Sequence, residues 1–167
     1  LVAFDILKPD LQQLQRMVHE SVEVQKHIVE EDPHEHGIRK ALNPGHTIGH
    51  AFDSWAMKHP ERLLSGPLLH GYAVAFGMIA ELYLAFIKCN FPQHIMRQCV
   101  TYIRDVYGTL PVTCNDYPEL LELMTHDKKN IAGTINFTLL GNIGDILINQ
   151  TATKEEIEEA LDFFREG

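Results

Sequence analysis

Residues 43–51 read Asn-Pro-Gly-His-Thr-Ile-Gly-His-Ala, and this stretch organises the interpretation of the whole chain. Asn43 is typical of a helix N-cap and Pro44 of a first helical position, so a helix is predicted over residues 44–58. At about 100° per residue this helix has two distinct faces. One is apolar and consists of Ile48, Ala51, Phe52 and Trp55. The other consists of His46, His50, Asp53 and Met57.

The two histidines on the polar face are candidates for a metal site. Histidines at positions i and i+4 of a helix can direct two imidazoles at one point, as metal-binding helices do. Gly45 and Gly49 remove side-chain bulk beside them, and His70 can close a site from a second direction. The alternative is that His46 and His50 are solvated surface residues. Spacing alone leaves both interpretations open.

The segment that follows is the most apolar in the chain. Residues 68–88 are long enough to cross a membrane. Glu81 lies near the middle, where a carboxylate would be costly in lipid. Small residues recur along the segment at Gly71, Ala73, Ala75, Gly77 and Ala80. We therefore expect a central buried helix that its neighbours approach closely.

Hydrophobic periodicity and turn signals predict the remaining elements. Further helices are expected over residues 9–31, with Pro9 at the first helical position, over 92–107 and 116–129, and from a Thr153–Glu156 capping box to Arg165. Residues 34–39 are expected to form a loop. Strands are expected over 134–140 and 143–148, joined by a turn at Gly141-Asn142. The fold class is thus mainly α, a single multi-helical domain over residues 1–167 with one small β-hairpin.

Composition excludes several classes of protein. The 167 residues are 45% hydrophobic and 22% charged, as in ordinary globular domains, which excludes a disordered tail or a disulfide scaffold. The formal net charge of -9 disfavours nucleic acid and membrane surfaces as partners. Three scattered cysteines and the lack of a visible signal peptide at residues 1–8 suit a reducing, cytoplasmic compartment.

Several motifs in order resemble the 3-dehydroquinate synthase family. The principal ones are Arg-Lys-Ala-Leu-Asn-Pro-Gly-His-Thr-Ile-Gly-His-Ala at 39–51 and Leu-His-Gly-Tyr-Ala-Val-Ala-Phe-Gly-Met at 69–78. Lys26, Val29, Asp32, Gly37 and Arg39 resemble the stretch just upstream in that family. Asp-Lys-Lys-Asn at 127–130 resembles its downstream basic motif. The similarity runs from about residue 26 to the predicted hairpin.

The resemblance implies an enzyme of the shikimate pathway. The family converts the anionic seven-carbon sugar-acid phosphate DAHP into 3-dehydroquinate and phosphate, using NAD and a divalent metal, usually zinc, and tends to form homodimers. In the family's reaction a transient ketone acidifies the neighbouring C–H, and the metal stabilises the alkoxide. The family's NAD-binding domain and a glutamate metal ligand lie upstream of the region matched here. We therefore expect a helical C-terminal domain, inactive alone.

Site residues follow from the same resemblance. The implied metal ligands are His46 and His70. The implied catalytic residues are His50, near the substrate phosphate, and Asn43, whose side chain could instead cap the helix. The implied substrate-binding residues are Lys26 and Arg39 for the carboxylate and one of Lys128 and Lys129 for the phosphate. Arginine suits a carboxylate because its planar fork engages two oxygens.

Two departures and three alternatives accompany this interpretation. Pro44 stands where the family usually has an aromatic residue, and Tyr72 where it has glutamate, which removes a possible partner of His70. Another sugar-phosphate cyclase, or a fragment of a metal-dependent alcohol or glycerol dehydrogenase, would share the architecture. A helical interaction module with incidental histidines is the third alternative. The carboxylate-binding pair Lys26 and Arg39 favours 3-dehydroquinate synthase.

Overall fold

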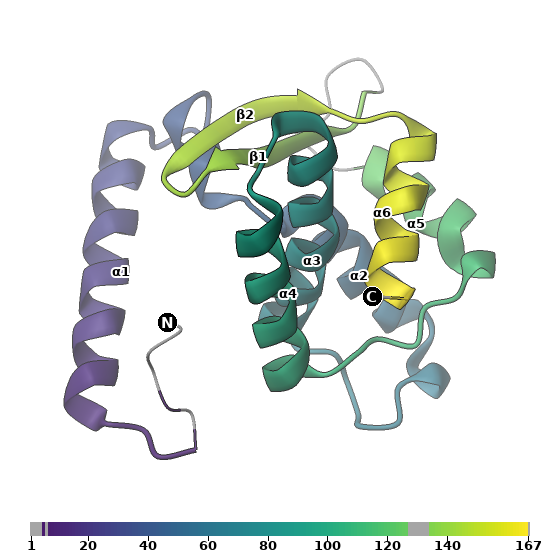
Figure 1. Ribbon diagram of the computed structural model, residues 1–167, viewed down its shortest axis with the longest axis horizontal. Coiled ribbons are helices and arrows are strands. Elements are labelled where there is room, and N and C mark those ends of the chain that lie inside the picture. The colour runs from purple at the N-terminus through teal and green to yellow at the C-terminus, as the bar shows by residue number, and fades with distance from the viewer. Residues whose placement is uncertain (1–4, 6, 127–133, 167) are drawn as a thin grey trace. The chain divides into compact units, whose positions relative to one another are not determined.

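A computed structural model describes residues 5, 7–126 and 134–166 of the chain (Figure 1). The chain divides into two compact units, residues 1–42 and 43–167, and each is described by itself.

The first unit contains one long helix, α1 (Leu11–Glu31), and a 3-10 helix, η1 (Ile38–Leu42). The helix predicted over 9–31 is confirmed, but Pro9 is not its first residue. Asp10 is the N-cap, and its carboxylate accepts hydrogen bonds from the N–H groups of Gln12 and Gln13 at 2.9 and 3.4 Å. The loop predicted over 34–39 is wrong for its last two residues, which begin η1.

The second unit is built around the predicted central helix, α3 (His70–Cys89). Its other elements are α2 (His46–Lys58), η2 (Pro60–Arg62), α4 (Gln93–Tyr107), η3 (Cys114–Asp116), α5 (Tyr117–Thr125), β1 (Asn136–Asn142), β2 (Asp145–Thr151) and α6 (Lys154–Glu166). Helices α2, α4 and α6 and strand β1 all contact α3 (Figure 1). The mainly helical fold with one hairpin is confirmed.

The turn of the hairpin lies two residues later in the chain than predicted. Asn142 pairs with Asp145, so Gly141-Asn142 ends β1 and the turn falls on Ile143-Gly144. Gly144 has a φ of 78°, a backbone conformation that glycine adopts readily. The Asn142 side chain accepts a hydrogen bond from the N–H of Ile143 at 2.8 Å. The turn therefore forms where a left-handed glycine is available.

Helix α3 has the packing of a core helix. Half of its most apolar 18-residue window is buried within the chain, although its length and composition would allow a membrane span. Its buried residues include Phe76, Ile79, Leu84 and the charged Glu81. They pack against the apolar face of α2, where Ile48, Phe52 and Trp55 have no exposed surface. The buried-helix interpretation is confirmed.

Helices α2 and α3 touch backbone to backbone at three glycines. A Cβ atom on Gly77 would lie 2.1 Å from the carbonyl oxygen of Gly45 and 2.5 Å from the nitrogen of Gly49. A Cβ atom on Gly49 would lie 3.0 Å from the carbonyl oxygen of Ala73. No side chain fits at Gly77 without separating the helices. This contact sets how close the start of α2 comes to α3.

A buried carboxylate from α3 caps the start of α2. Glu81 is 3% exposed and accepts hydrogen bonds from the N–H groups of Gly45 at 2.5 Å and Ile48 at 2.9 Å. Gly45 occupies the N-cap position with a φ of 80°. The prediction of an Asn43 N-cap with Pro44 at the first helical position is therefore wrong. A residue distant in sequence supplies the cap that a local side chain usually gives.

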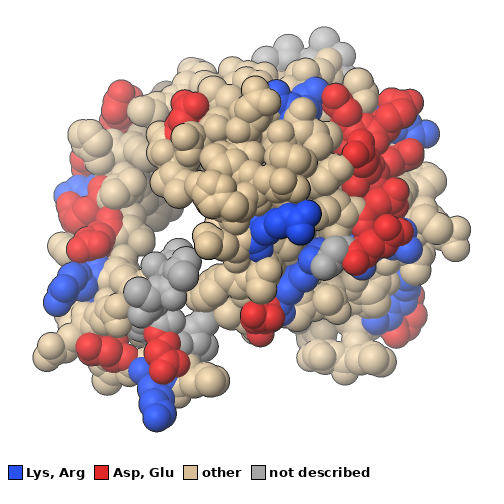
Figure 2. All heavy atoms as spheres, viewed as in Figure 1, with Lys and Arg blue, Asp and Glu red and all other residues tan. Residues whose placement is uncertain are grey.

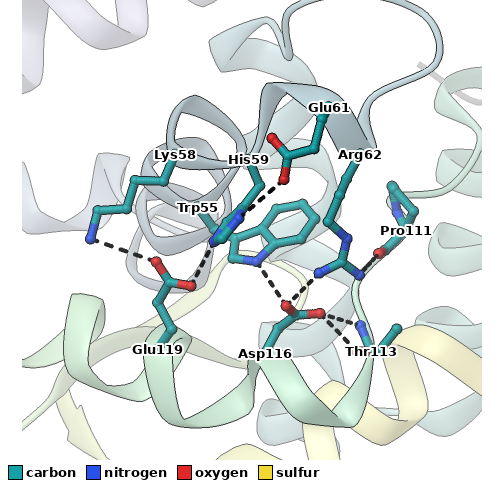
Figure 3. A network of polar contacts seen from close by, with 9 residues as sticks. All are labelled: Trp55, Lys58, His59, Glu61, Arg62, Pro111, Thr113, Asp116 and Glu119. Atoms are coloured by element: carbon teal, nitrogen blue, oxygen red, sulfur yellow. Dashed lines mark hydrogen bonds and ion pairs between the residues drawn. The ribbon is translucent and has the colours of Figure 1, made fainter.

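A polar network joins the end of α2 to η3 and α5 (Figure 3). The buried Asp116 carboxylate accepts hydrogen bonds from Trp55 Nε1 at 3.2 Å, from Arg62 Nη1 at 2.6 Å and from the backbone N–H of Thr113 at 2.7 Å. Burial raises the pKa of Asp116, but hydrogen bonds from Arg62, Thr113 and Trp55 outweigh it and hold that pKa below its usual value. Alongside, a hydrogen bond to Glu119 raises the pKa of His59.

Replacing Gly77 by alanine should destabilise the chain by about 3 kcal/mol, because the added methyl group would clash with backbone atoms of Gly45 and Gly49. Backbone atoms cannot avoid such a clash by changing rotamer, as a side chain can. The measurement is the midpoint of urea unfolding. Gly71→Ala is the matched control in the same helix, since a Cβ atom there meets nothing within 4 Å. Equal midpoints for the two variants would contradict the close contact.

Replacing Asp116 by asparagine should cost about 2 kcal/mol near neutral pH, since charged hydrogen bonds are lost. The folded pKa of Asp116 lies below its unfolded value, so the stabilisation is present above that unfolded value and is lost as pH falls through the folded pKa. The difference in unfolding free energy between the two proteins should therefore shrink below about pH 4. The exposed Asp105→Asn is the control; a difference independent of pH would refute the assignment.

Candidate metal centre

Three imidazoles from two helices meet in the second unit. His46 and His50 come from α2, and His70 is the first residue of α3. One nitrogen from each ring lies within 4.8 Å of the other two. The ring centroids are 5.4 Å apart for His46 and His50, 5.6 Å for His50 and His70, and 6.0 Å for His46 and His70. The alternative of two unrelated surface histidines does not describe this arrangement.

The helix contact explains how the sequence brings the rings together. His46 and His50 are one turn apart on the face of α2 opposite the buried Ile48 and Trp55. The glycine contact holds the first turns of α2 against residues 73–78, close to the start of α3. His70, at that start, then reaches the same point from the second helix.

Two of the rings have an oxygen acceptor at Nδ1. His46 Nδ1 lies 3.1 Å from the carbonyl oxygen of Pro44, and His70 Nδ1 lies 3.1 Å from Oδ2 of Asp53. A carbonyl or carboxylate oxygen can only accept, so in each neutral ring the proton lies on Nδ1 and the lone pair on Nε2. Sequence reasoning placed Asp53 on the histidine face but gave it no role. Its spacing of three residues from His50 was the available signal.

The donor set fits a divalent transition metal. Neutral imidazole nitrogens are preferred ligands of zinc and cobalt, and three protein ligands are common at zinc sites that keep a position for substrate. The rings are accessible, since His46 and His50 are half-buried and His70 is exposed. In the part of the chain that the structure describes, no other group of three histidine, cysteine or acidic side chains lies this close.

Two predicted substrate ligands lie in the first unit. Lys26 is exposed on α1, and Arg39 is half-buried in η1. The Asp32 carboxylate holds this turn, accepting hydrogen bonds from the N–H groups of Gly37 at 2.7 Å and Arg39 at 3.2 Å. The bond from Gly37, with others from the same turn, lowers the pKa of Asp32. Arg39 Nη1 donates to the carbonyl oxygen of Pro33 at 2.6 Å. The roles of Lys26 and Arg39 stay predictions.

The remaining predicted site residues are Asn43, Lys128 and Lys129. Asn43 is half-buried just before α2, and its carbonyl oxygen accepts a hydrogen bond from the N–H of His46 at 3.1 Å. Its role toward substrate stays a prediction. Lys128 and Lys129 lie outside the described residues. Tyr72, at the position where the resemblance led us to expect glutamate, packs edge-on against Tyr107 with ring centroids 5.0 Å apart.

Acidic side chains gather on another face of the second unit. Figure 2 shows them along α6, whose sequence Lys-Glu-Glu-Ile-Glu-Glu-Ala-Leu-Asp-Phe-Phe-Arg-Glu supplies the negative charges. Some are paired, as Glu156 is with Lys88 at 2.7 Å. A surface of this charge repels anions, so it is no candidate for binding a phosphorylated ligand.

Comparison with known proteins supports the family resemblance. The profile of a family described as 3-dehydroquinate synthase C-terminal matches residues 3–130. A 3-dehydroquinate synthase of Parabacteroides distasonis is 54% identical over 167 residues, which are 100% of this chain and 46% of that protein. One of Geobacillus kaustophilus is 34% identical over 155 residues, which are 90% of this chain and 39% of that protein. The chain spans about half the length of the curated relatives it matches.

Two solved structures share the fold. A crystal structure of 2-deoxy-scyllo-inosose synthase complexed with carbaglucose-6-phosphate, NAD+ and Co2+ matches with a TM-score of 0.69 and 23% identity, covering 93% of this chain and 41% of that chain. A second structure of 2-deoxy-scyllo-inosose synthase matches with a TM-score of 0.66 and 22% identity, covering 93% of this chain and 40% of that one. This chain therefore shares the fold of the matching part of 2-deoxy-scyllo-inosose synthase.

The three-histidine cluster should bind one Zn2+ or Co2+ per chain. His46→Ala and His70→Ala should each weaken binding by at least about 100-fold, more than the loss of an outer partner of a ligand usually causes. Calorimetric titration with Zn2+ measures the effect. The exposed His94 on α4 provides the control variant His94→Ala, which should bind as the unchanged chain does. Equal affinities for all four proteins would refute the cluster as the metal site.

Proposed function

This chain belongs to the 3-dehydroquinate synthase family, as its C-terminal domain, and from that membership we propose that it forms the metal- and substrate-binding domain, residues 1–167, of an enzyme converting DAHP into 3-dehydroquinate and phosphate. The observation that carries the proposal is the meeting of His46, His50 and His70 at one point. The family relationship supports the proposed reaction, and the cluster supports a part for this chain in it.

His46 and His70 are the proposed ligands of a divalent metal, with zinc as the expected ion. Their support is the pair of Nδ1 contacts, which place the proton of each neutral ring on Nδ1 and its lone pair on Nε2. His46 and His70 would hold the metal, which would supply polarisation of the substrate hydroxyls, and NAD would supply the redox chemistry. The solved relative with NAD+ and Co2+ supports this combination in the fold.

His50 is the proposed proton carrier at the substrate phosphate. It lies in the same cluster, on the same face of α2 as His46, and is half-buried. An imidazole titrates near neutral pH and can hold or give up a proton where the phosphate leaves. Asn43, next to the start of α2, is the proposed polar contact to the substrate. Its carbonyl is already held by His46, which fixes the backbone there.

Four basic residues are the proposed ligands of the two anionic groups of the substrate. Arg39 and Lys26 hold the carboxylate, and Arg39 does so with two parallel hydrogen bonds. One of Lys128 and Lys129 holds the phosphate. The Asp32-supported turn fixes the backbone from which the Arg39 side chain extends, which supports a positioning role for that segment.

We also propose a cytoplasmic homodimer with no nucleic-acid or membrane partner. The net charge of -9 and the burial of α3 support the lack of nucleic-acid and membrane partners, while the homodimer and the location are proposed from the family resemblance. The second candidate is another sugar-phosphate cyclase, because two solved structures with this fold are of 2-deoxy-scyllo-inosose synthase. Arg39 and Lys26 favour a substrate that carries a carboxylate, as DAHP does.

The 167 residues alone should form no dehydroquinate, since they contain no strand–GxGxxG–helix pattern for NAD. Joined to the preceding part of the Parabacteroides distasonis relative, in place of that enzyme's own C-terminal half, the chain should convert DAHP in the presence of NAD and Zn2+. Release of phosphate and dehydroquinate is measured. An inactive but folded, metal-loaded chimera would contradict the proposal, as would activity of the chain alone.

In the same chimera, His50→Ala should lower kcat by about 100-fold or more while metal affinity falls less than in His46→Ala. The physical reason is that a lost proton carrier acts on the chemical step and leaves both proposed ligands in place. Steady-state kinetics on DAHP, with His94→Ala as control, measure the effect. An unchanged kcat would remove His50 from the proposed chemistry.

A further inference from the structure

The carboxylate of Asp53 lies against the histidine that comes from the other helix. Asp53 is on α2, and its Oδ2 is 3.1 Å from Nδ1 of His70 at the start of α3. The carboxyl group is largely covered, with 22% of the side chain exposed, while the imidazole is 57% exposed. The Asp53 carboxylate is therefore the more firmly packed partner, and the exposed His70 imidazole is the group whose orientation this contact can fix.

The chemistry of the acceptor determines the proton on His70. An ionised carboxylate has no hydrogen to donate, so the neutral ring must place its proton on Nδ1 to make this contact. The lone pair is then on Nε2, the nitrogen available to an ion. His46 is held in the same tautomer by the Pro44 carbonyl. Two rings from two helices thus have Nδ1 tied to an oxygen acceptor.

The position of Asp53 on α2 lets this helix orient His70, which belongs to α3. His46, His50 and Asp53 recur at intervals of four and three residues, so they share one face of a single helix. The same rigid element carries two imidazoles and the group that orients the third. Tyr72, two residues after His70, does not carry an acid and packs against Tyr107 instead. The carboxylate that contacts His70 comes instead from Asp53 of α2.

We propose that Asp53 is a positioning residue for His70: its carboxylate fixes the Nδ1–H tautomer and the ring direction, so that Nε2 faces the site shared with His46 and His50. The inference rests on the proposed metal-binding role of the cluster. An ordinary surface ion pair would be the plainer account of a contact between an acid and an exposed histidine. The two accounts differ in what they predict for the ring's tautomer and for metal affinity.

The first measurement needs no metal. Long-range 1H–15N correlation spectra of the 167-residue chain at about pH 8, above the usual histidine pKa, report which nitrogen of His70 carries the proton. His70→Ala assigns the signal. We expect the Nδ1–H tautomer in the unchanged chain and a shift toward Nε2–H in Asp53→Asn, because an amide can present its N–H as well as its oxygen. A His70 ring in the Nε2–H tautomer in the unchanged chain overturns the proposal outright.

The second measurement is the titration of the same proteins with Co2+, followed by visible absorption. Asp53→Asn should weaken Co2+ binding by about 10- to 100-fold, as is usual for the outer partner of a histidine ligand. Asp53→Glu should recover part of that loss. The exposed Asp105→Asn is the matched control and should leave affinity unchanged.

The outcomes separate this inference from the proposed function. Co2+ binding that is equal in the unchanged chain and in folded Asp53→Asn overturns the positioning role while the metal site stands. An unchanged chain that binds no Co2+, yet shows the Nδ1–H tautomer, overturns the metal site and supports the orientation of His70 by Asp53. If Asp53→Asn fails to fold, the tautomer of the unchanged chain and the affinity of Asp53→Glu still decide the question.

Discussion

The direct backbone contact between α2 and α3 is the constraint on which the second unit depends. Gly77 leaves no room for a side chain against Gly45 and Gly49, and Glu81 from the next turn of α3 binds the first N–H groups of α2. One contact is steric and the other electrostatic, and both act at the start of α2. They bury the apolar face of that helix in the core and leave its histidine face accessible. The core and the candidate metal centre are therefore two sides of one helix packing.

Much of the fold could be predicted because its signals are local. Hydrophobic periodicity predicted α1 and α4, a long apolar run predicted α3, and the Thr153–Glu156 capping box predicted the start of α6. That box is present, and Thr153 N–H donates to the Glu156 carboxylate at 2.8 Å. One error arose where a distant residue decides the local structure. Asn43-Pro44 is a good local helix start, yet Glu81 reaches α2 from α3 and moves the N-cap to Gly45. The hairpin error has a local cause, because the turn follows the left-handed Gly144 and not the Gly141-Asn142 pair.

In the candidate site, too, local sequence signals predicted some features, while contacts between residues distant in sequence determine the others. The spacing of His46 and His50 is a helical signal, and it predicted that two rings share a face. That His70 joins them depends on the packing of two helices; the sequence offered His70 as a possible third member, and the family resemblance added its role as a ligand. Asp53 had no role in the sequence interpretation, because a contact between residues 53 and 70 is a property of the helix crossing. The positions of Lys26 and Arg39 belong to a separate unit and follow from a different set of local contacts.

Glu81 also has a consequence for how anions can bind. The start of a helix carries a partial positive charge and unpaired N–H groups, and phosphates often bind there. At α2 the N–H groups of Gly45 and Ile48 are already taken by a carboxylate, and that of His46 by the Asn43 carbonyl. The helix dipole is thus neutralised from within. In a chain of net charge -9, an anionic ligand near this helix must therefore be held by side chains or a bound cation, whose electrostatic attraction salt screens.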